Sequence, residues 1–191
     1  NRSQDDPNMS AVTSDNYAGG RKIAEFLLAA GHKKIGHIAG WHGASTQRDR
    51  EAGFISALAD AGVALHSRSE GDFTMARAAE AARKMFTHDA PDAVFVANDH
   101  MALAVLDTLR FELGMKVPDD VSVVGYDDVP AAGWRAYDLT TVRQPANRMV
   151  TNTVEILLDQ IENNTGETRR IAIDGPLIVR GSARIPKGWT K

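Results

Sequence analysis

The chain has 191 residues and a net charge of −3, from 22 Lys and Arg against 25 Asp and Glu. This length fits one domain or slightly more, and a hydrophobic fraction of 43% with a charged fraction of 25% excludes a disordered or collagen-like chain. The charge argues against a broad nucleic-acid-binding surface, the lack of cysteine excludes disulfides and thiolate metal sites, and no apolar run approaches the ~20 residues of a membrane span.

Helix-period segments and short apolar segments alternate along nearly the whole chain. Asp15 and Thr74 have side chains suited to N-caps, and Gly31 suits the position after a helix. Helices are predicted at residues 15–30, 47–61, 74–86, 99–113 and 146–161. Strands are predicted at residues 9–13, 34–39, 93–97, 121–125, 169–173 and 177–180.

This alternation predicts an α/β fold with a parallel sheet and right-handed crossovers. Sheets of this kind bind ligands beyond the carboxyl ends of their strands. The rule directs attention to the loop after Ala39, to residues 71–73, to the turn after Ala97 and to the loop after Gly125.

Arg50 is the first candidate, at the start of the helix that follows the Ala39 loop. The sequence places Arg48 and Arg50 in the first turn, where basic side chains oppose the helix dipole. Such a local conflict is typical of a functional position, and a guanidinium there can bind two neighbouring hydroxyls or a carboxylate. The alternative is a solvated Arg whose neighbour Asp49 offsets the dipole.

Polar side chains follow two other predicted strands. Asn98 offers an acceptor and two donors, while Asp99 is most simply the N-cap of the next helix. Asp127 and Asp128 follow VSVVGY, and neighbours on an extended segment point apart, so a shared metal is not expected. We favour Asp127 as a ligand acceptor and Asp128 as structural.

Other motifs are less specific. Phe73 has the right character to stack on a sugar, but a lone aromatic is equally suited to the core. The six histidines form no metal-binding pattern, and the phosphate, dinucleotide and nucleophile-elbow motifs are absent. No metal or cofactor is expected.

Several ordered segments resemble the LacI/GalR family of bacterial transcription regulators. The match covers nearly the whole chain at consistent spacing. The matching segments are GHKKIGHIAG (31–40), REAGF (50–54), GDF (71–73), PDAVFVAND (91–99), VPDDVSVVGYDD (117–128), LTTVRQP (139–145) and LIVRGS (177–182).

The resemblance implies a two-lobed fold like that of periplasmic binding proteins, behind an N-terminal DNA-binding headpiece. Residues 14–143 and 175–191 would form an essentially complete C-terminal lobe. Residues 1–13 and 144–174 would be remnants of the N-terminal lobe, and the headpiece would be absent. The ligand of this family lies in the cleft between the lobes.

Carried over position by position, the family pattern implies a set of ligand-binding residues. Arg50 would clamp ligand hydroxyls, Asp127 would accept hydrogen bonds, and Phe73 would stack on the ligand. Three further positions, Thr46, Gln144 and Asn1, rest on the resemblance alone. The full set is Arg50, Asp127, Asn98, Phe73, Thr46, Gln144 and Asn1.

The resemblance indicates the effector-binding domain of a regulator rather than an enzyme. A sugar or sugar derivative would bind between the lobes and change operator affinity through the headpiece, in a cytoplasmic homodimer. No membrane association is expected. One alternative is a periplasmic sugar-binding protein of the same fold; the other is an α/β enzyme using Asp127 and Asp128.

Overall fold

The structure, a computed structural model, describes residues 8–163 and 167–190, which form two separate sheets. A six-stranded sheet has the order β3-β2-β4-β5-β6-β8, and a two-stranded sheet pairs β1 with β7. The strands are β1 (Ala11–Ser14), β2 (Ile35–Ala39), β3 (Ser67–Glu70), β4 (Ala93–Val96), β5 (Ser122–Asp127), β6 (Thr140–Arg143), β7 (Arg170–Ile173) and β8 (Leu177–Ile178). The helices are α1 (Asn16–Ala29), α2 (Ser45–Asp60), α3 (Met75–Met85), α4 (Asp99–Asp107) and α5 (Ala146–Asn163), with a π-helical turn at Thr108–Glu112 and a 3₁₀ turn at Pro130–Gly133.

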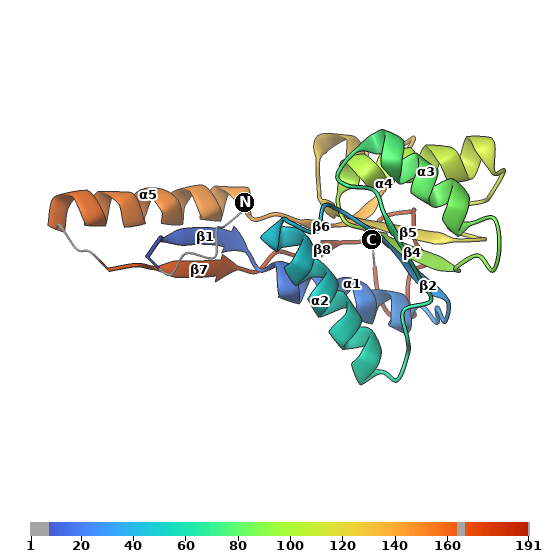
Figure 1. The fold of residues 1–191 in the computed structure, drawn as a ribbon, viewed down its shortest axis with the longest axis horizontal. Coiled ribbons are helices and arrows are strands. Elements are labelled where there is room, and N and C mark those ends of the chain that lie inside the picture. The colour runs from blue at the N-terminus through green and yellow to red at the C-terminus, as the bar shows by residue number, and fades with distance from the viewer. Residues whose placement is uncertain (1–7, 164–166, 191) are drawn as a thin grey trace.

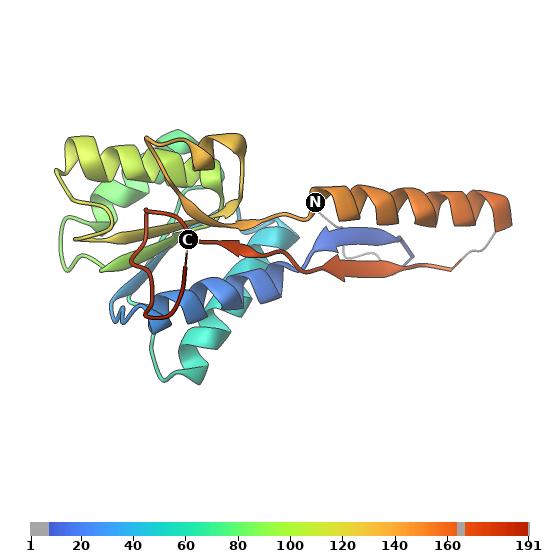
Figure 2. The ribbon, with the colours of Figure 1, turned by 180° about the vertical axis from the view of Figure 1, so that it is seen from behind.

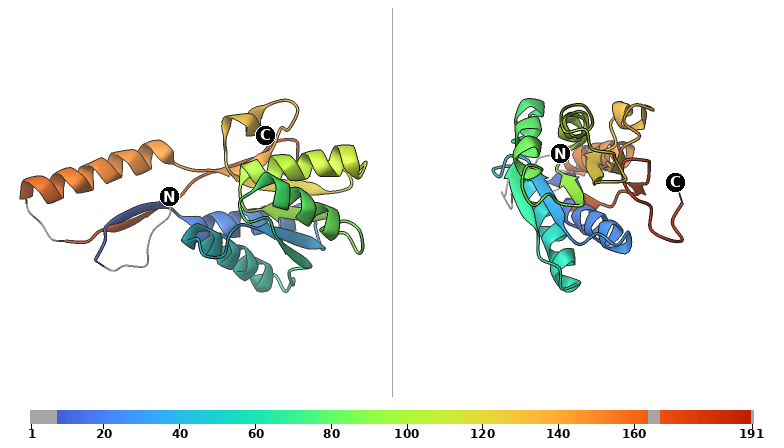
Figure 3. Two further views of the ribbon diagram at one scale, coloured as in Figure 1. Left: turned by 45° about the horizontal axis from the view of Figure 1, so that its top comes forward. Right: turned by 90° about the vertical axis from the view of Figure 1, so that its right-hand side faces the viewer.

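The large sheet is covered by helices on both faces (Figure 3). Its strands run parallel except for β8, which is antiparallel to β6. Alternate residues of β4 serve opposite faces: Phe95 packs with α1 and α2, whereas Val94 and Val96 pack with α3 and α4. This burial on both sides explains why β4 is apolar throughout.

The small sheet and α5 form an arm that projects from the large sheet (Figures 1 and 2). The chain enters and leaves the arm through three connections, which follow β1, β6 and β7. Ile156 is the buried residue of α5. The arm leaves at the carboxyl ends of β5 and β6, since Arg143 pairs with Asp127 and α5 begins shortly after it.

The structure confirms the predicted fold class and most predicted elements. Asp15 caps α1 by accepting from the amide of Ala18, and Thr74 caps α3 by accepting from the amide of Arg77. Gly31 follows α1 with a φ of 83°, a conformation that favours glycine.

One predicted helix start and one predicted N-cap are wrong. Helix α2 begins at Ser45 rather than Gln47, so Arg50 lies in its second turn and the dipole argument does not apply to it. The N-cap of α4 is Asn98, whose Oδ1 accepts from the amide of Met101, and not Asp99. The helix predicted at residues 99–113 also changes at Thr108 to π-helical geometry.

Strands β3 and β6 were not predicted, and β5 extends into residues expected to be irregular. The sequence of β3 is polar because it lies at the edge of the sheet and pairs only with β2. Strand β6 is only four residues long, and its identity as a strand depends on pairing with β5, which is distant in sequence.

Candidate ligand site at the carboxyl ends of the strands

Arg50 lies at the centre of the polar groups that follow β4 and β5. Its side chain is almost fully buried, and three of its nitrogens donate hydrogen bonds within the chain. Nε donates to Oδ1 of Asn16 at 2.9 Å, Nη1 to the carbonyl of Ala97 at 2.7 Å, and Nη2 to Oδ1 of Asp127 at 3.3 Å. The Cζ atom lies 3.6 Å from the ring centroid of Tyr126. The guanidinium is therefore held on several sides at once.

Asp127 is joined to Arg50 and to the connection that leads into the arm. Its Oδ1 also accepts from Nε2 of Gln144 at 2.5 Å, and its carbonyl accepts from the amide of Gln144 at 3.3 Å. Burial raises the pKa of Asp127 above its ordinary value, while the Arg50 guanidinium acts in the opposite direction. The fold thus brings three of the predicted site positions together in one contiguous cluster, which consists of Arg50, Asp127 and Gln144.

Asp128 has a different environment from its neighbour. Its carboxylate accepts from Nε of Arg143 at 2.6 Å and from Nη2 of Arg180 at 2.7 Å. Asp127 and Asp128 both have positive φ angles, 122° and 56°, so the chain turns sharply at the end of β5. Asp128 fastens β6 and the segment after β8, which agrees with its structural interpretation.

Asn98 and Asp99 use their side chains mainly within the chain. The Oδ1 of Asn98 serves the helix cap, which leaves the Nδ2 hydrogens as the group it can offer to a ligand. The Asp99 carboxylate accepts from Oγ1 of Thr141 at 2.7 Å and from the amide of Val129 at 2.9 Å. Burial raises the pKa of Asp99 to about 6.

Phe73 lies on the loop between β3 and α3, and Thr46 lies in the first turn of α2, which follows β2. The ring of Phe73 covers Gly40, where a Cβ atom would come within 2.3 Å of it, and Phe73 packs partly against the core. Phe73 has a φ of 57°, so its loop is bent at that residue. Thr46 is buried in the first turn of α2. Asn1 lies outside the described residues.

A buried chain of hydrogen bonds supports the start of the loop that follows β2. The Nδ1 of His37 donates to the carbonyl of Phe95 at 3.0 Å, and its Nε2 faces Nε2 of Gln47 at 3.2 Å. The Oε1 of Gln47 accepts from the amide of Gly40 at 2.7 Å. Burial lowers the pKa of His37 to about 4, so the ring is neutral and accepts from Gln47.

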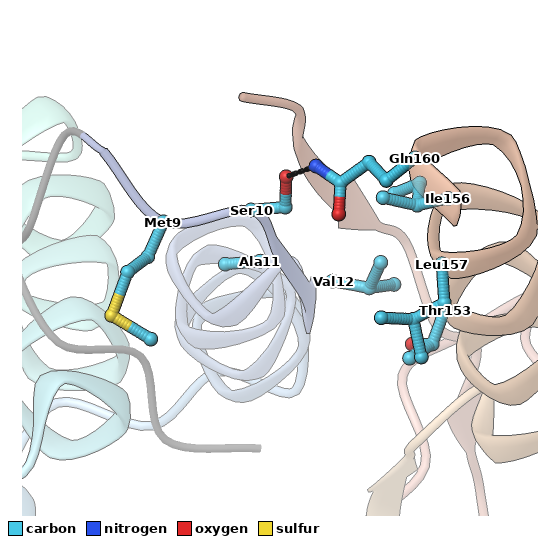
Figure 4. A pocket seen from close by; sticks show the side chains of 8 residues that line it. All are labelled: Met9, Ser10, Ala11, Val12, Thr153, Ile156, Leu157 and Gln160. Carbon is cyan, nitrogen blue, oxygen red and sulfur yellow. Dashed lines mark hydrogen bonds between the residues drawn. The ribbon is translucent and has the colours of Figure 1, made fainter. Parts of the chain in front are cut away.

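Two hollows lie beside the arm. One of about 200 Å³ separates the first turns of α2, at Ser45 and Asp49, from Thr13 and Arg170 of the small sheet. The other, of about 180 Å³ and mostly apolar, lies between β1 and α5 and contains none of the predicted site residues (Figure 4). The first hollow adjoins the helix that carries Arg50, but its lining likewise includes none of the predicted site residues.

Sequence reasoning missed the partners that hold Arg50. In the sequence, Asn16 simply follows the Asp15 cap, and Tyr126 lies within the VSVVGYDD segment. Neither residue carries a local signal, because each acquires its role when α1, α2 and β5 meet in the fold. Among the described residues, no cluster of His, Asp or Glu is arranged to hold a metal ion.

Comparisons with known proteins place these features in a wider context. The chain matches the periplasmic binding protein-like domain family over residues 24–183. It is 36% identical over 169 residues to the HTH-type transcriptional repressor PurR of Photobacterium profundum, covering 87% of this chain and 50% of that protein. It is 38% identical over 178 residues to the HTH-type transcriptional regulator CelR of Thermobifida fusca, covering 91% of this chain and 52% of that protein.

A solved structure described as a transcriptional regulator CelR–cellobiose complex has a TM-score of 0.86 to this chain at 37% identity. The alignment covers 92% of this chain and 54% of the other. The chain therefore spans about half the length of the curated relatives it matches. Within the described residues, no helix combines the length and the apolar character needed to cross a bilayer.

Proposed function

Because the chain belongs to the periplasmic-binding-protein-like family, in its branch of LacI-type regulators, we propose that it senses a small sugar or sugar derivative. The Arg50–Asp127–Gln144 cluster at the strand ends supports this proposal most strongly. It combines a cationic donor, an acidic acceptor and an amide, which suits the donor and acceptor pattern of neighbouring hydroxyls.

The charge balance of the cluster favours a neutral ligand. Arg50 is already paired with Asp127, and Asp127 repels a second anion placed on the same edge of the guanidinium. We therefore rank free sugars, with cellobiose first because of the CelR relative, above sugar phosphates and sugar acids.

The same proposal extends to the arm and to the whole protein. In it, residues 14–143 and 175–191 are the C-terminal lobe, and residues 1–13 and 144–174 belong to an N-terminal lobe. The sugar binds between the lobes and biases one lobe arrangement over another, which changes operator affinity through an N-terminal headpiece. We also propose a homodimer, located in the cytoplasm and without catalytic activity.

The proposed ligand contacts are completed by Asn98, Phe73, Thr46 and Gln144. A further proposed contact, Asn1, lies outside the described residues. Gln144 has the strongest geometric support of these, since it shares the acceptor of Arg50. Phe73 supports the stacking role less directly, because its ring already covers Gly40.

Calorimetric titration of the full-length protein with sugars, nucleosides and amino acids tests the proposal. Cellobiose and glucose should bind more tightly than glucose 6-phosphate. Failure of every sugar, with a nucleoside or an amino acid binding instead, would overturn the sugar assignment.

Substitution of Arg50 tests the residue that carries the site. Arg50→Ala should abolish binding, and Arg50→Lys should weaken it at least tenfold, since charge-assisted hydrogen bonds contribute about 1.5–3 kcal/mol and the forked geometry is lost. Arg21→Ala is the matched control, because Arg21 pairs with Asp60 on the outer surface. A change of less than threefold for Arg50→Ala would contradict the role of Arg50.

A further inference from the structure

Asn16 connects the buried face of Arg50 to the start of α1. Its Oδ1 accepts from Nε of Arg50 at 2.9 Å, and its Nδ2 donates to the carbonyl of Ser14 at 2.9 Å. Asn16 is only 4% exposed, so it is withdrawn from the solvent that a ligand would displace. Both ends of its amide are occupied, which fixes the orientation of the acceptor that Arg50 meets.

Tyr126 supports the guanidinium from a second direction. The plane of its ring lies under Cζ of Arg50 at 3.6 Å, and its hydroxyl lies 3.2 Å from Oγ of Ser14. Tyr126 is fully buried. Gly19 makes room for the ring, since a Cβ atom there would lie 2.4 Å from the hydroxyl oxygen.

Two glycines bring α1 and α2 close enough for these contacts. A Cβ atom at Gly20 would lie 2.1 Å from the carbonyl oxygen of Arg50, and one at Gly53 would lie 2.0 Å from that of Tyr17. Both clashes are with backbone, which cannot move aside as a flexible side chain can. The close contact between the two helices therefore fixes the position of Asn16 relative to Arg50.

Nε of Arg50 donates to Asn16, Nη1 to the carbonyl of Ala97, and Nη2 to Asp127, the residue next to the proposed ligand site. A guanidinium has five N–H donors, and these three hydrogen bonds leave two of them, one on Nη1 and one on Nη2, for a ligand. An arginine side chain loses much rotamer entropy when it is ordered, and holding it in place before binding removes that cost from the binding step.

We propose that Asn16 and Tyr126 are positioning residues, which orient Arg50 for the ligand without touching the ligand themselves. The proposal rests on the proposed function for its effect on affinity. Its structural half, the immobilisation of Arg50, stands independently and can be measured without any ligand.

Nuclear magnetic resonance of arginine Nε–H groups tests the structural half in the full-length protein. The Arg50 signal is identified by its loss in Arg50→Lys, and it should exchange slowly with water. Asn16→Ala should make this exchange at least tenfold faster, whereas Asn16→Asp keeps an acceptor and should restore protection. The Nε–H of Arg21 serves as the internal control. Unchanged exchange in Asn16→Ala would overturn the proposal.

A double-mutant cycle with cellobiose as the probe tests the effect on binding. Asn16→Ala should weaken cellobiose binding at least fivefold when Arg50 is present, but less than twofold in an Arg50→Lys background, since Asn16 acts only through Arg50. Tyr126→Leu should behave likewise, and Tyr126→Phe, which keeps the ring, should lose less. Equal losses in both backgrounds would overturn the positioning role.

A substitute variant and the ligand-free exchange measurement keep failure of this proposal distinct from misfolding and from failure of the proposed function. If Asn16→Ala fails to fold, Asn16→Ser is used, because its short hydroxyl does not reach Nε; it should give the same two results. If cellobiose does not bind the unsubstituted protein, the sugar ranking fails while the exchange experiment still decides whether Asn16 holds Arg50.

Discussion

Adjacent aspartates after β5 illustrate how surroundings assign roles to identical side chains. Asp127 shares one oxygen between Arg50 and Gln144, next to the proposed ligand site. Asp128, just after the end of β5, is paired with both Arg143 and Arg180. The sequence predicted different roles for the two carboxylates from the alternation of an extended segment, whereas the structure separates them by a sharp turn with positive φ at both residues.

Asp127→Asn should therefore weaken sugar binding more than Asp128→Asn. The first change removes the charge that faces the ligand, whereas the second removes two ion pairs and should mainly lower the melting temperature. Calorimetry and thermal unfolding of both variants separate the two effects. Equal losses of affinity would indicate a loop shape that exposes both carboxylates to the ligand.

Buried titratable groups predict how stability depends on pH. The pKa of Asp99 is raised to about 6 from an ordinary 3.8, so the folded state binds the proton more tightly than the unfolded state. Its stabilising contribution is complete below pH 4 and is lost as the pH rises through 6. Asp99→Asn removes this loss and should raise the free energy of unfolding near pH 7 by about 2–3 kcal/mol relative to its effect at pH 4.

His37 has the opposite dependence and provides the comparison. Its pKa is lowered from 6.5 to about 4, so stability from its neutral form is present above pH 6.5 and is lost as the pH falls through 4. Denaturant titrations at pH 4, 5.5 and 7 measure both groups. The assignment to Asp99 would be contradicted if the difference in the free energy of unfolding between Asp99→Asn and the unsubstituted protein stayed constant across this pH range.

At the scale of elements, the contact between α1 and α2 is the most tightly constrained. Gly20→Ala places a methyl group against the backbone of Arg50, so the helices must separate. We expect a loss of about 1–3 kcal/mol, as for overpacked cores, measured by urea unfolding. Glu25→Ala on the exposed side of α1 is the control and should change stability by less than about 0.5 kcal/mol, as surface pairs do. An unchanged stability in Gly20→Ala would show that α1 can shift freely.

The elements also show where sequence reasoning reaches its limit. Helix α5 was predicted from its helical apolar periodicity and strand β4 from its unbroken apolar run, and both signals are visible locally. Strands β3 and β6 were missed because their identity comes from pairing with distant partners. The same limit applies to the site: Arg50 and Asp127 follow strand ends and were found, whereas Asn16 is placed by helix packing.

At the scale of the whole molecule, the arm leaves an apolar face uncovered. Several large side chains of α5 are between 47% and 75% exposed, whereas Ile156 is buried. These exposed residues are Val150, Val154, Leu157, Leu158 and Ile161. Two parallel strands and one helix make a small unit, since a two-stranded sheet is marginal by itself. The 191-residue chain is thus expected to cover this face by association.

Light scattering and a dye that binds apolar surfaces test this expectation with the 191-residue chain. We expect self-association, dye binding, and a marked reduction of both when Leu157→Gln and Ile161→Lys are combined, because exposed apolar patches of this kind promote association. Ile55→Gln on α2 is the matched control, since Ile55 is exposed but lies outside the arm. A dilute, stable monomer of 20.7 kDa that binds no dye would show that α5 is satisfied within its own chain, and the assignment of residues 144–174 to an N-terminal lobe would then be wrong.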